Sequence, residues 1–442
     1  MNKIYYLITL IALSYISTNA LYSANQSLAG RITDAKSGDA LAGVTVIIEN
    51  TAMGAVTDGK GMFRIPVIKK GNYNVLISYI GYKAKKIPVR IDENKVTELN
   101  ESLAEEVIQT GEVVVSAAKR VQAVQEVPVS VSVINNIALQ QRNITRIDDA
   151  LQYVPGVSMN GEDVSIRGSA GYTFGLGSRV TLLLDGIPML SGDLADIKLG
   201  SLPFFNIERI EVVKGAGSAL YGTSALGGVI NVISKEPTAI PDIRAKAFAG
   251  VYTKPRFDEW KYSDKLHMNN GLDLGYSQKL GEFSMLLHGS YYLDESYRKY
   301  DDSRRYSAYT KFGYDFSDFT KARLTLNFSE EDAADWVYWK NLNNATSPPD
   351  STDTRIRFVS GNMAAMGELK HVFSAEHFVY LRLNYYHTYH HTTHDIHDSE
   401  YRQSRANSIF SEAQLNSNFF QWLLLTSGAN LTLNDVNSNT FG

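Results

Sequence analysis

The 442-residue chain contains no cysteine, so it forms no disulfides, offers no thiolate metal ligands and has no thiol nucleophile. After its first residues it also lacks any apolar run of about 20 residues, the length that a membrane-spanning helix needs, which excludes a helical membrane protein. The net charge is only −4, and this gives no reason to expect nucleic acid as a partner. What the chain does have is 26 tyrosines and 11% aromatic residues, a content that suits the aromatic girdles of membrane β-barrels.

Residues 1–20 are typical of a secretory signal peptide. Lys3 supplies the charged region, residues 4–16 form the apolar stretch, and Thr18-Asn19-Ala20 provides small residues for cleavage. The apolar stretch is too short for a comfortable membrane span. We therefore expect an exported protein that is cleaved after Ala20.

Residues 21–104 predict a small β-sandwich. Two β-rich runs at 44–49 and 73–79 are separated by glycine-containing turn signals at the spacing that an all-β fold requires. The segment resembles the carboxypeptidase-regulatory-like domain in four motifs, at residues 30–34, 41–46, 57–63 and 79–82. The resemblance implies a binding or spacer role without catalytic residues, on the periplasmic side of the membrane.

Between residues 164 and 235 the chain is a series of short β-branched strands punctuated by glycines. Four blocks occur in order: Val-Ser-Ile-Arg-Gly, Val-Thr-Leu-Leu-Leu-Asp-Gly-Ile-Pro, Ile-Glu-Arg-Ile-Glu-Val-Val-Lys-Gly, and Ala-Leu-Gly-Gly-Val-Ile-Asn-Val-Ile-Ser-Lys. In this succession they resemble the plug domain of TonB-dependent outer-membrane receptors. The resemblance places a plug domain at residues 121–236 and implies a transport receptor, not an enzyme.

The resemblance also implies roles for named plug residues. It predicts charge contacts with the barrel wall from Arg167, Glu208, Arg209 and Glu211, although solvated ions in a wet lumen would show the same residues. It predicts that plug apices face the ligand at two places, namely Tyr172, Thr173 and Phe174, and then Leu190, Ser191 and Asp193.

A linker at residues 105–120 contains a short β-prone segment outside either domain. The segment consists of Glu112, Val113, Val114, Val115, Ser116 and Ala117. Such a segment is a candidate for strand pairing with a partner's sheet edge, in which backbone hydrogen bonds supply the affinity. Its position resembles the TonB box, which implies TonB of the inner-membrane energy-coupling complex as the partner. An ordinary first strand of the plug is the alternative.

From residue 243 onward the sequence alternates with a period of two. Leu324, Leu326 and Phe328 alternate with polar residues, and similar patterns surround residues 272–277 and 379–386. One apolar and one polar face per strand predict a barrel with lipid outside and water inside. About nine such segments are present at residues 243–442, whereas plugged transporters need about 22 strands. We therefore expect an incomplete barrel that belongs to a larger receptor.

Five of the nine histidines lie at residues 387–397, beside Asp395 and Asp398. Imidazoles with carboxylates can hold a transition metal, and His390 and His394 would share one face of an extended strand. The alternative is a polar outer loop that is merely rich in histidine. We predict no resident cofactor.

The sequence as a whole predicts a mainly β protein: a small β-sandwich, an α+β plug domain and an incomplete antiparallel transmembrane β-barrel. The resemblance implies a receptor of the cell outer membrane, in contact with its lipid, that takes up a scarce bulky nutrient. A ferric siderophore or other metal chelate is the first expectation. Cobalamin, haem or a glycan, an inactive truncated remnant and a surface anchor protein are the alternatives.

Overall fold

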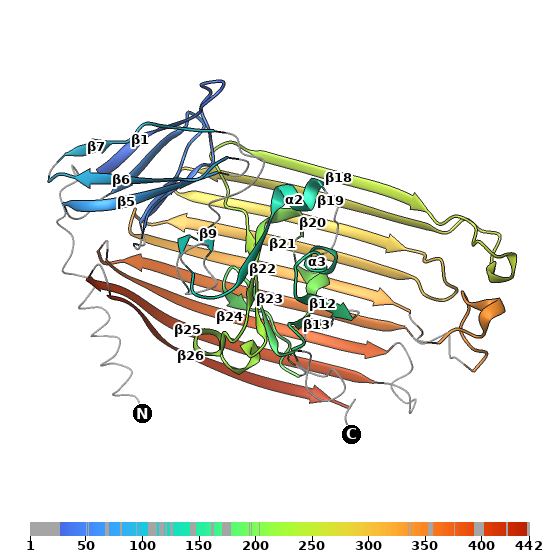
Figure 1. Cartoon of the computed structure of the whole chain (residues 1–442). Coiled ribbons are helices and arrows are strands. Elements are labelled where there is room, and N and C mark those ends of the chain that lie inside the picture. The colour runs from blue at the N-terminus through green and yellow to red at the C-terminus, as the bar shows by residue number, and fades with distance from the viewer. Residues whose placement is uncertain are drawn as a thin grey trace, which may run out of the picture.

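Three units follow one another along the chain in the computed structural model (Figure 1). A small two-sheet domain comes first, a mixed domain of strands and short helices follows, and a nine-stranded antiparallel sheet comes last. The predicted fold class is thus confirmed. The predicted signal peptide lies outside the described residues. These are residues 27–439 except 50, 52, 67–69, 80–81, 94, 105–112, 115–118, 120–121, 124–126, 142–146, 161–162, 170–177, 194, 196, 203, 335, 337, 352–356, 375, 393–401 and 421–422.

The first unit is a β-sandwich of two four-stranded sheets. One sheet contains β1 (Ser27–Asp34), β4 (Met62–Pro66), β7 (Val96–Glu98) and β8 (Glu101–Leu103). The other contains β2 (Thr45–Ile48), β3 (Gly54–Val56), β5 (Gly71–Ser78) and β6 (Lys85–Ile91). Alternate residues such as Leu28, Val46 and Ile77 are fully buried between the sheets, which is the pattern that half-buried strands produce.

The second unit is built on a five-stranded mixed sheet in the order β11-β16-β17-β14-β15. The strands are β11 (Val131–Asn135), β14 (Val180–Leu184), β15 (Ile187–Pro188), β16 (Ile207–Lys214) and β17 (Gly228–Ser234). Beside the sheet lie the hairpin β12 (Val157–Asn160) and β13 (Asp163–Ile166), and the helices α2 (Asn136–Gln141), α3 (Ile147–Leu151) and α4 (Ser218–Tyr221). Every residue of β14 is buried, so this strand lies in the core of the unit.

The nine strands of the large sheet pair in sequence order, each antiparallel to the next. They are β18 (Asp242–Val251), β19 (Met268–Leu280), β20 (Phe283–Asp294), β21 (Ser303–Asp315), β22 (Thr320–Ala333), β23 (Phe358–Val372), β24 (His377–Thr392), β25 (Gln403–Phe420) and β26 (Leu423–Ser438). On β22, Leu324 and Leu326 are more than 40% exposed, whereas Thr325 between them is 7% exposed. The predicted alternation is confirmed: the polar face of the sheet points toward the second unit, which is the predicted plug, and the apolar face points away from it.

The two ends of the sheet differ in their connections. Short turns occupy residues 281–282, 316–319 and 373–376 at one end, and long loops occupy 252–267, 295–302 and 334–357 at the other. The sandwich lies at the short-turn end, where Val372 and Phe378 beside a turn join its core (Figure 1). Outer-membrane barrels have short periplasmic turns and longer outer loops. By this criterion the sandwich end corresponds to the periplasmic end of such a barrel.

Part of the histidine-rich stretch lies in a strand instead of a loop. Strand β24 continues to Thr392, so that His387, His390 and His391 pair with β23 and β25. The strand extends because Thr388, Tyr389 and Thr392 are residues that favour extended backbone. His394 lies outside the described residues.

No helix within the described part of the chain is long and apolar enough to cross a membrane.

Candidate functional site

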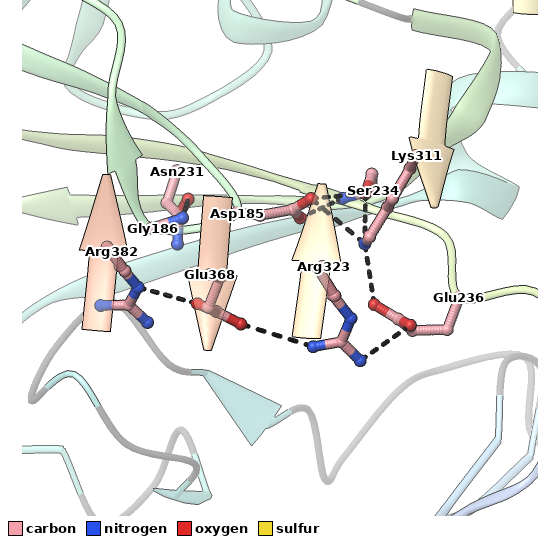
Figure 2. A network of polar contacts seen from close by, with 9 residues as sticks. All are labelled: Asp185, Gly186, Asn231, Ser234, Glu236, Lys311, Arg323, Glu368 and Arg382. Carbon is pink, nitrogen blue, oxygen red and sulfur yellow. Dashed lines mark hydrogen bonds and ion pairs between the residues drawn. The ribbon is translucent and has the colours of Figure 1, made fainter. Parts of the chain in front are cut away.

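The plug lies against the polar face of the large sheet, and the contact between them is the candidate site (Figure 1). At its centre is Lys311 of β21, whose side chain is 5% exposed. Its Nζ donates to Asp185 Oδ2 at 3.2 Å, to Ser234 Oγ at 2.9 Å and to Glu236 Oε1 at 2.8 Å. One lysine of the large sheet, which we call the wall, therefore holds three side chains of the plug (Figure 2).

The plug presents these acceptors through a tight turn between β14 and β15. Asp185 has a φ of 50° and the following Gly186 a φ of 82°, so that the chain reverses at Asp-Gly. The Asp185 carboxylate accepts hydrogen bonds from the Ser234 backbone N–H at 2.8 Å and from its hydroxyl at 2.6 Å. The Gly186 N–H donates to Asn231 Oδ1 at 3.0 Å, which fixes the turn on β17.

Glu236, in the connection from the plug to the first barrel strand, is held by two cations. Its second oxygen accepts from Arg323 Nη2 of β22 at 3.0 Å, in addition to the contact with Lys311. Burial alone would raise the pKa of this carboxyl, but Arg323 and Lys311 outweigh that effect and lower the pKa to about 2. Glu236 is therefore ionised at neutral pH.

The charges continue across the wall in alternating sign. Strand register places Arg323 opposite Glu368, Glu368 opposite Arg382, and Arg382 opposite Glu412. The corresponding N···O distances are 3.5, 2.8 and 2.9 Å (the first two pairs appear in Figure 2). Each of these charges has an oppositely charged neighbour on the next strand, which offsets the cost of removing it from water.

The row ends at Lys119, which follows the predicted coupling segment. Lys119 Nζ pairs with Glu412, its carbonyl accepts from Gln414 Nε2 at 3.2 Å, and its ammonium lies 4.9 Å from the centre of the Tyr221 ring. The Lys119 side chain is 10% exposed. The chain is thus fixed to β25 just after the predicted coupling segment.

Three further contacts join the plug to the wall. Ser404 Oγ donates to Asp193 Oδ2 at 2.6 Å, and Asn384 Nδ2 donates to the Pro188 carbonyl at 2.9 Å. Arg305 Nη1 donates to the Gly200 carbonyl at 3.3 Å. The contact therefore extends over β21, β24 and β25. It combines these hydrogen bonds and ion pairs with buried wall residues that join the apolar core of the plug, among them Tyr309, Met366 and Tyr386.

The predicted wall-contact residues lie on β16 and in the turn after β13, and Glu208 is close enough to Lys311 of β21 for that charge to act on its carboxyl. Arg167 is exposed in a turn with a φ of 53°. Arg209 pairs with Glu208 at 2.7 Å and with Glu211 at 2.8 Å, both on its own strand β16. Burial raises the pKa of Glu208 in spite of this pairing. Their assignment to the wall stays a prediction.

The residues that form the ion pairs described above were not among the predicted wall contacts. Asp185 belongs to the Leu-Asp-Gly motif that identified the plug, and Arg323 and Arg382 lie on the predicted polar face. The usable signal is a charged residue on the polar face of several consecutive strands. The sequence contains that signal, but it does not show which charges meet.

The predicted ligand-facing and coupling residues are only partly described. Leu190 and Ser191 line a cavity between the plug and the wall, whereas residues 172–174 lie outside the described residues. Val113 and Val114 form the short strand β9 (Val113–Val114), which pairs with β10 (Gln122–Ala123). Glu112, Val115, Ser116 and Ala117 lie outside the described residues.

The histidines of β24 do not gather at one point. His387 Nδ1 lies 2.8 Å from Asn407 Oδ1, and the His390 ring stacks on Phe358 with centroids 5.9 Å apart. Among the residues that the structure describes, no group of three or more His, Asp or Glu side chains is arranged to hold a metal ion. A site that includes His394 stays a prediction.

The outer loops are tied to one another. Trp336 Nε1 donates to the Lys299 carbonyl and Trp260 Nε1 to the Leu342 carbonyl, each at 2.7 Å. The Arg298 guanidinium lies 4.5 Å from the centre of the Trp336 ring and forms two hydrogen bonds with Asp301. These contacts join three loops at the long-loop end of the sheet.

Comparison with known proteins agrees with this architecture. Residues 123–229 match the TonB-dependent receptor plug domain, and residues 28–115 match the CarboxypepD_reg-like domain. The vitamin B12 transporter of Vibrio vulnificus (strain YJ016) is 38% identical over 127 residues, 28% of this chain and 21% of that protein. The iron-regulated outer membrane virulence protein of Vibrio cholerae is 40% identical over 148 residues, 30% of this chain and 22% of that protein.

Solved structures share the fold over a larger part of the chain. The unliganded ferric citrate transporter superposes with a TM-score of 0.60 at 18% identity, covering 71% of this chain and 49% of that one. The ferripyoverdine receptor of the Pseudomonas aeruginosa outer membrane gives a TM-score of 0.55 at 14% identity, covering 80% and 52%. The chain thus spans about half of these structures. The chain contains a TonB-dependent receptor plug domain and a CarboxypepD_reg-like domain, and its fold is similar to that of solved outer-membrane receptors.

Proposed function

We propose that this receptor imports a scarce metal chelate, first of all a ferric siderophore, by an energy-coupled displacement of its plug. The observation that carries the proposal is the row of ion pairs from Asp185 and Glu236 of the plug to Lys119. Contacts of this kind can be exchanged for water one at a time, whereas an apolar seal cannot. They suit a plug that must stay closed at rest and yield under force.

The force enters through the coupling segment. Strand β9 is two residues long and pairs only with β10 among the described strands, so its other edge is available for a partner. TonB of the inner-membrane energy-coupling complex would add a strand at residues 112–117 and pull toward the periplasm. The pull would reach Lys119 first and then the wall pairs behind it.

A proline substitution in the full-length receptor tests the coupling step. Val114→Pro removes a backbone donor and blocks strand pairing. We expect energy-dependent uptake to fall to background while ligand binding at the cell surface persists. Val96→Pro, on an exposed position of the sandwich strand β7, is the matched control for a proline in a short strand. Undiminished uptake by the Val114→Pro receptor would exclude this segment as the coupling site.

The choice of an iron chelate rests on the family. Relatives include a ferric aerobactin receptor of Klebsiella pneumoniae and a ferrioxamine B receptor of Salmonella typhimurium, beside the vitamin B12 transporter. These similarities extend over about a third of the chain or less, so cobalamin stays as the second candidate. Deletion of the gene should impair growth on a ferric siderophore as the only iron source, and expression should rise on iron starvation. Normal growth on every iron chelate tested, with a defect on cobalamin, would select the second candidate.

A further inference from the structure

The β-sandwich is docked on the large sheet at the short-turn end (Figure 1). Val372 of β23 and Phe378 of β24 are register partners, are 7% and 8% exposed, and belong to the same apolar cluster as the core of the sandwich. Phe319, in a neighbouring turn, packs against this cluster. Burial and, after it, the Glu376 carboxylate raise the pKa of the Tyr73 phenol, so Tyr73 of β5 lies close to the turn between β23 and β24. The contact is therefore a packed apolar interface between the two units.

This interface is continuous with the row of ion pairs on the wall. Phe378, Tyr380 and Arg382 are alternate residues of β24, so their side chains share the face that points toward the plug. The rings of Phe378 and Tyr380 meet edge to face with centroids 5.6 Å apart, and the Arg382 guanidinium lies 4.5 Å from the centre of the Tyr380 ring. Arg382 in turn pairs with Glu368 at 2.8 Å (Figure 2). The sandwich thus supports a cation of the row through two aromatic rings.

The sandwich also touches the connection that carries Glu236. This connection runs from β17 of the plug to β18 of the wall. A Cβ added at Gly43 would lie 3.6 Å from Thr238 Cγ2, and one added at Gly59 would lie 3.4 Å from Ile240 Cγ1, which are ordinary packing distances. Glu236, two residues before Thr238, is held by two cations of the wall. One domain is thus in contact with both sides of the attachment of the plug.

The chain itself joins the sandwich to the plug. The Lys83 N–H donates to the Ala104 carbonyl at 2.9 Å, which fixes the end of the domain shortly before β9. After β9 in the sequence, Lys119 is held by Glu412 of the wall. A pull on β9 therefore loads the sandwich through the chain as well as Lys119.

We propose that the sandwich is a clamp on the attachment of the plug, and that it must leave the large sheet before the plug can separate from the wall. When docked, it packs against the Glu236 connection on one side and supports Arg382 on the other. When it leaves, both sides of the attachment lose a packed neighbour, so the ion pairs weaken. By the reciprocity of coupled equilibria, separation of the plug must also weaken the docking of the sandwich. The inference goes beyond the proposed function, on which only its uptake measurement rests.

A reversible tether in the full-length receptor tests whether the clamp must open. Gly59→Cys and Ile240→Cys join the sandwich to the connection at positions within reach of a disulfide, and residues 1–442 contain no other cysteine. We expect the oxidised double variant to bind a ferric siderophore at the cell surface but to import it at least about 10-fold more slowly than the reduced form. The control is Thr45→Cys with Val56→Cys, two cross-strand neighbours within the sandwich, whose uptake should be the same when oxidised and when reduced.

A second measurement shows whether the docked sandwich strengthens the attachment at rest. Tyr73→Ala removes a partly buried ring from the interface, whereas Met62→Ala, the control, removes a side chain of the same domain that is 45% exposed. Without an energy supply, a protease should cut plug sites near the wall at least about 5-fold faster in Tyr73→Ala than in the wild type, the lower end of typical coupling between two sites. Met62→Ala should be cut at the wild-type rate. Cleavage within the sandwich, followed in the same samples, should stay at the wild-type rate in both variants.

The outcomes separate the two proposals. Full uptake by the oxidised Gly59→Cys and Ile240→Cys receptor, with the disulfide shown to be formed, would overturn the clamp and leave the proposed function standing. Equal cleavage of the plug in Tyr73→Ala and the wild type would overturn the clamp in the same way. If the wild-type receptor imports no metal chelate, the proposed function fails, and the protease measurement then decides the clamp on its own.

Discussion

The interior of the plug and its contact with the wall are built from different interactions. Inside the plug, Leu182, Leu184, Ile210, Ile230 and Val232 are all 0% exposed and form a continuous aliphatic core. At the wall, a few apolar side chains such as Met366 join that core, but the fixed contacts are Lys311 and its acceptors and the row of ion pairs behind them. The difference indicates a unit that holds together internally while its attachment can be undone.

The largest expected effect comes from the core. Ile230→Ala in the full-length receptor should lower the free energy of unfolding of the plug by about 2–5 kcal/mol, because a fully buried side chain leaves a cavity. Leu226→Ala is the control: Leu226 is 51% exposed in the same unit, and its loss should change stability by about 0.5 kcal/mol or less. The urea concentration at which a protease begins to cleave the plug measures the loss of stability in each variant. Equal effects of the two variants would contradict the assigned core.

A smaller effect of a different kind is expected at the wall. Lys311→Met leaves Asp185 without its cation and Glu236 with Arg323 alone, and we expect a loss of about 2–3 kcal/mol, since both carboxylates keep some contact with water. The plug should detach without unfolding. Its cleavage sites near the wall should open while core sites stay protected.

The control for Lys311 is a lysine of the neighbouring strand. Lys321 is 36% exposed and lies 3.8 Å from Asp315, so Lys321→Met should cost at most about 1 kcal/mol. A triple variant adds Asp185→Asn and Glu236→Gln to Lys311→Met. If attachment of the plug is restored in it, the loss in Lys311→Met came from the unpaired carboxylates. Cleavage of core and wall sites together in Lys311→Met would show that attachment and folding are one event.

The smallest effect is a dependence on pH. The pKa of Glu236 is lowered to about 2 from its ordinary value of 4.5, so its contribution to attachment is fully present above pH 4.5 and is lost as the pH falls toward 2. Protection of the wall sites from an acid-active protease should therefore decline between about pH 4.5 and pH 2. Glu236→Gln should remove that part of the decline. A wild-type profile that is superimposable on the profile of the variant would refute the assignment.

The sequence predicted the faces of the barrel strands because alternation is a local property. Leu324 and Leu326 point away from the plug and Arg323 toward it, as the period of two required. The four blocks of the plug were also recognisable, because glycine and β-branched residues recur at short range. For this chain the sequence alone therefore predicts which segments are strands and which face of each strand is polar.

The contacts between elements that are distant in sequence could not be predicted from the sequence. The pairing of Arg323, Glu368, Arg382 and Glu412 depends on the register of four strands, and a shift by one residue would turn every side chain to the other face. Lys119 carries no signal of its own, since it meets Glu412 across 293 residues of sequence. Arg167 and the Glu208–Arg209–Glu211 cluster were chosen because their motifs resemble the family, and motif membership does not say which way a side chain points.

The central claim is that the plug separates from β24, β25 and β26 during uptake, and a reversible tether tests it most directly. A Cβ added at Gly192 would lie 3.3 Å from Ala406 Cβ, close to the separation that a disulfide requires, and residues 1–442 contain no cysteine to interfere. The full-length receptor with Gly192→Cys and Ala406→Cys should bind ligand when oxidised but import none, and reduction should restore uptake. All variants carry Ser408→Ala, because a Cβ at Gly192 would otherwise lie 2.6 Å from Ser408 Oγ. In that background each single cysteine substitution should import normally under both conditions. Full uptake by the oxidised double variant, with the disulfide shown to be formed, would contradict the account.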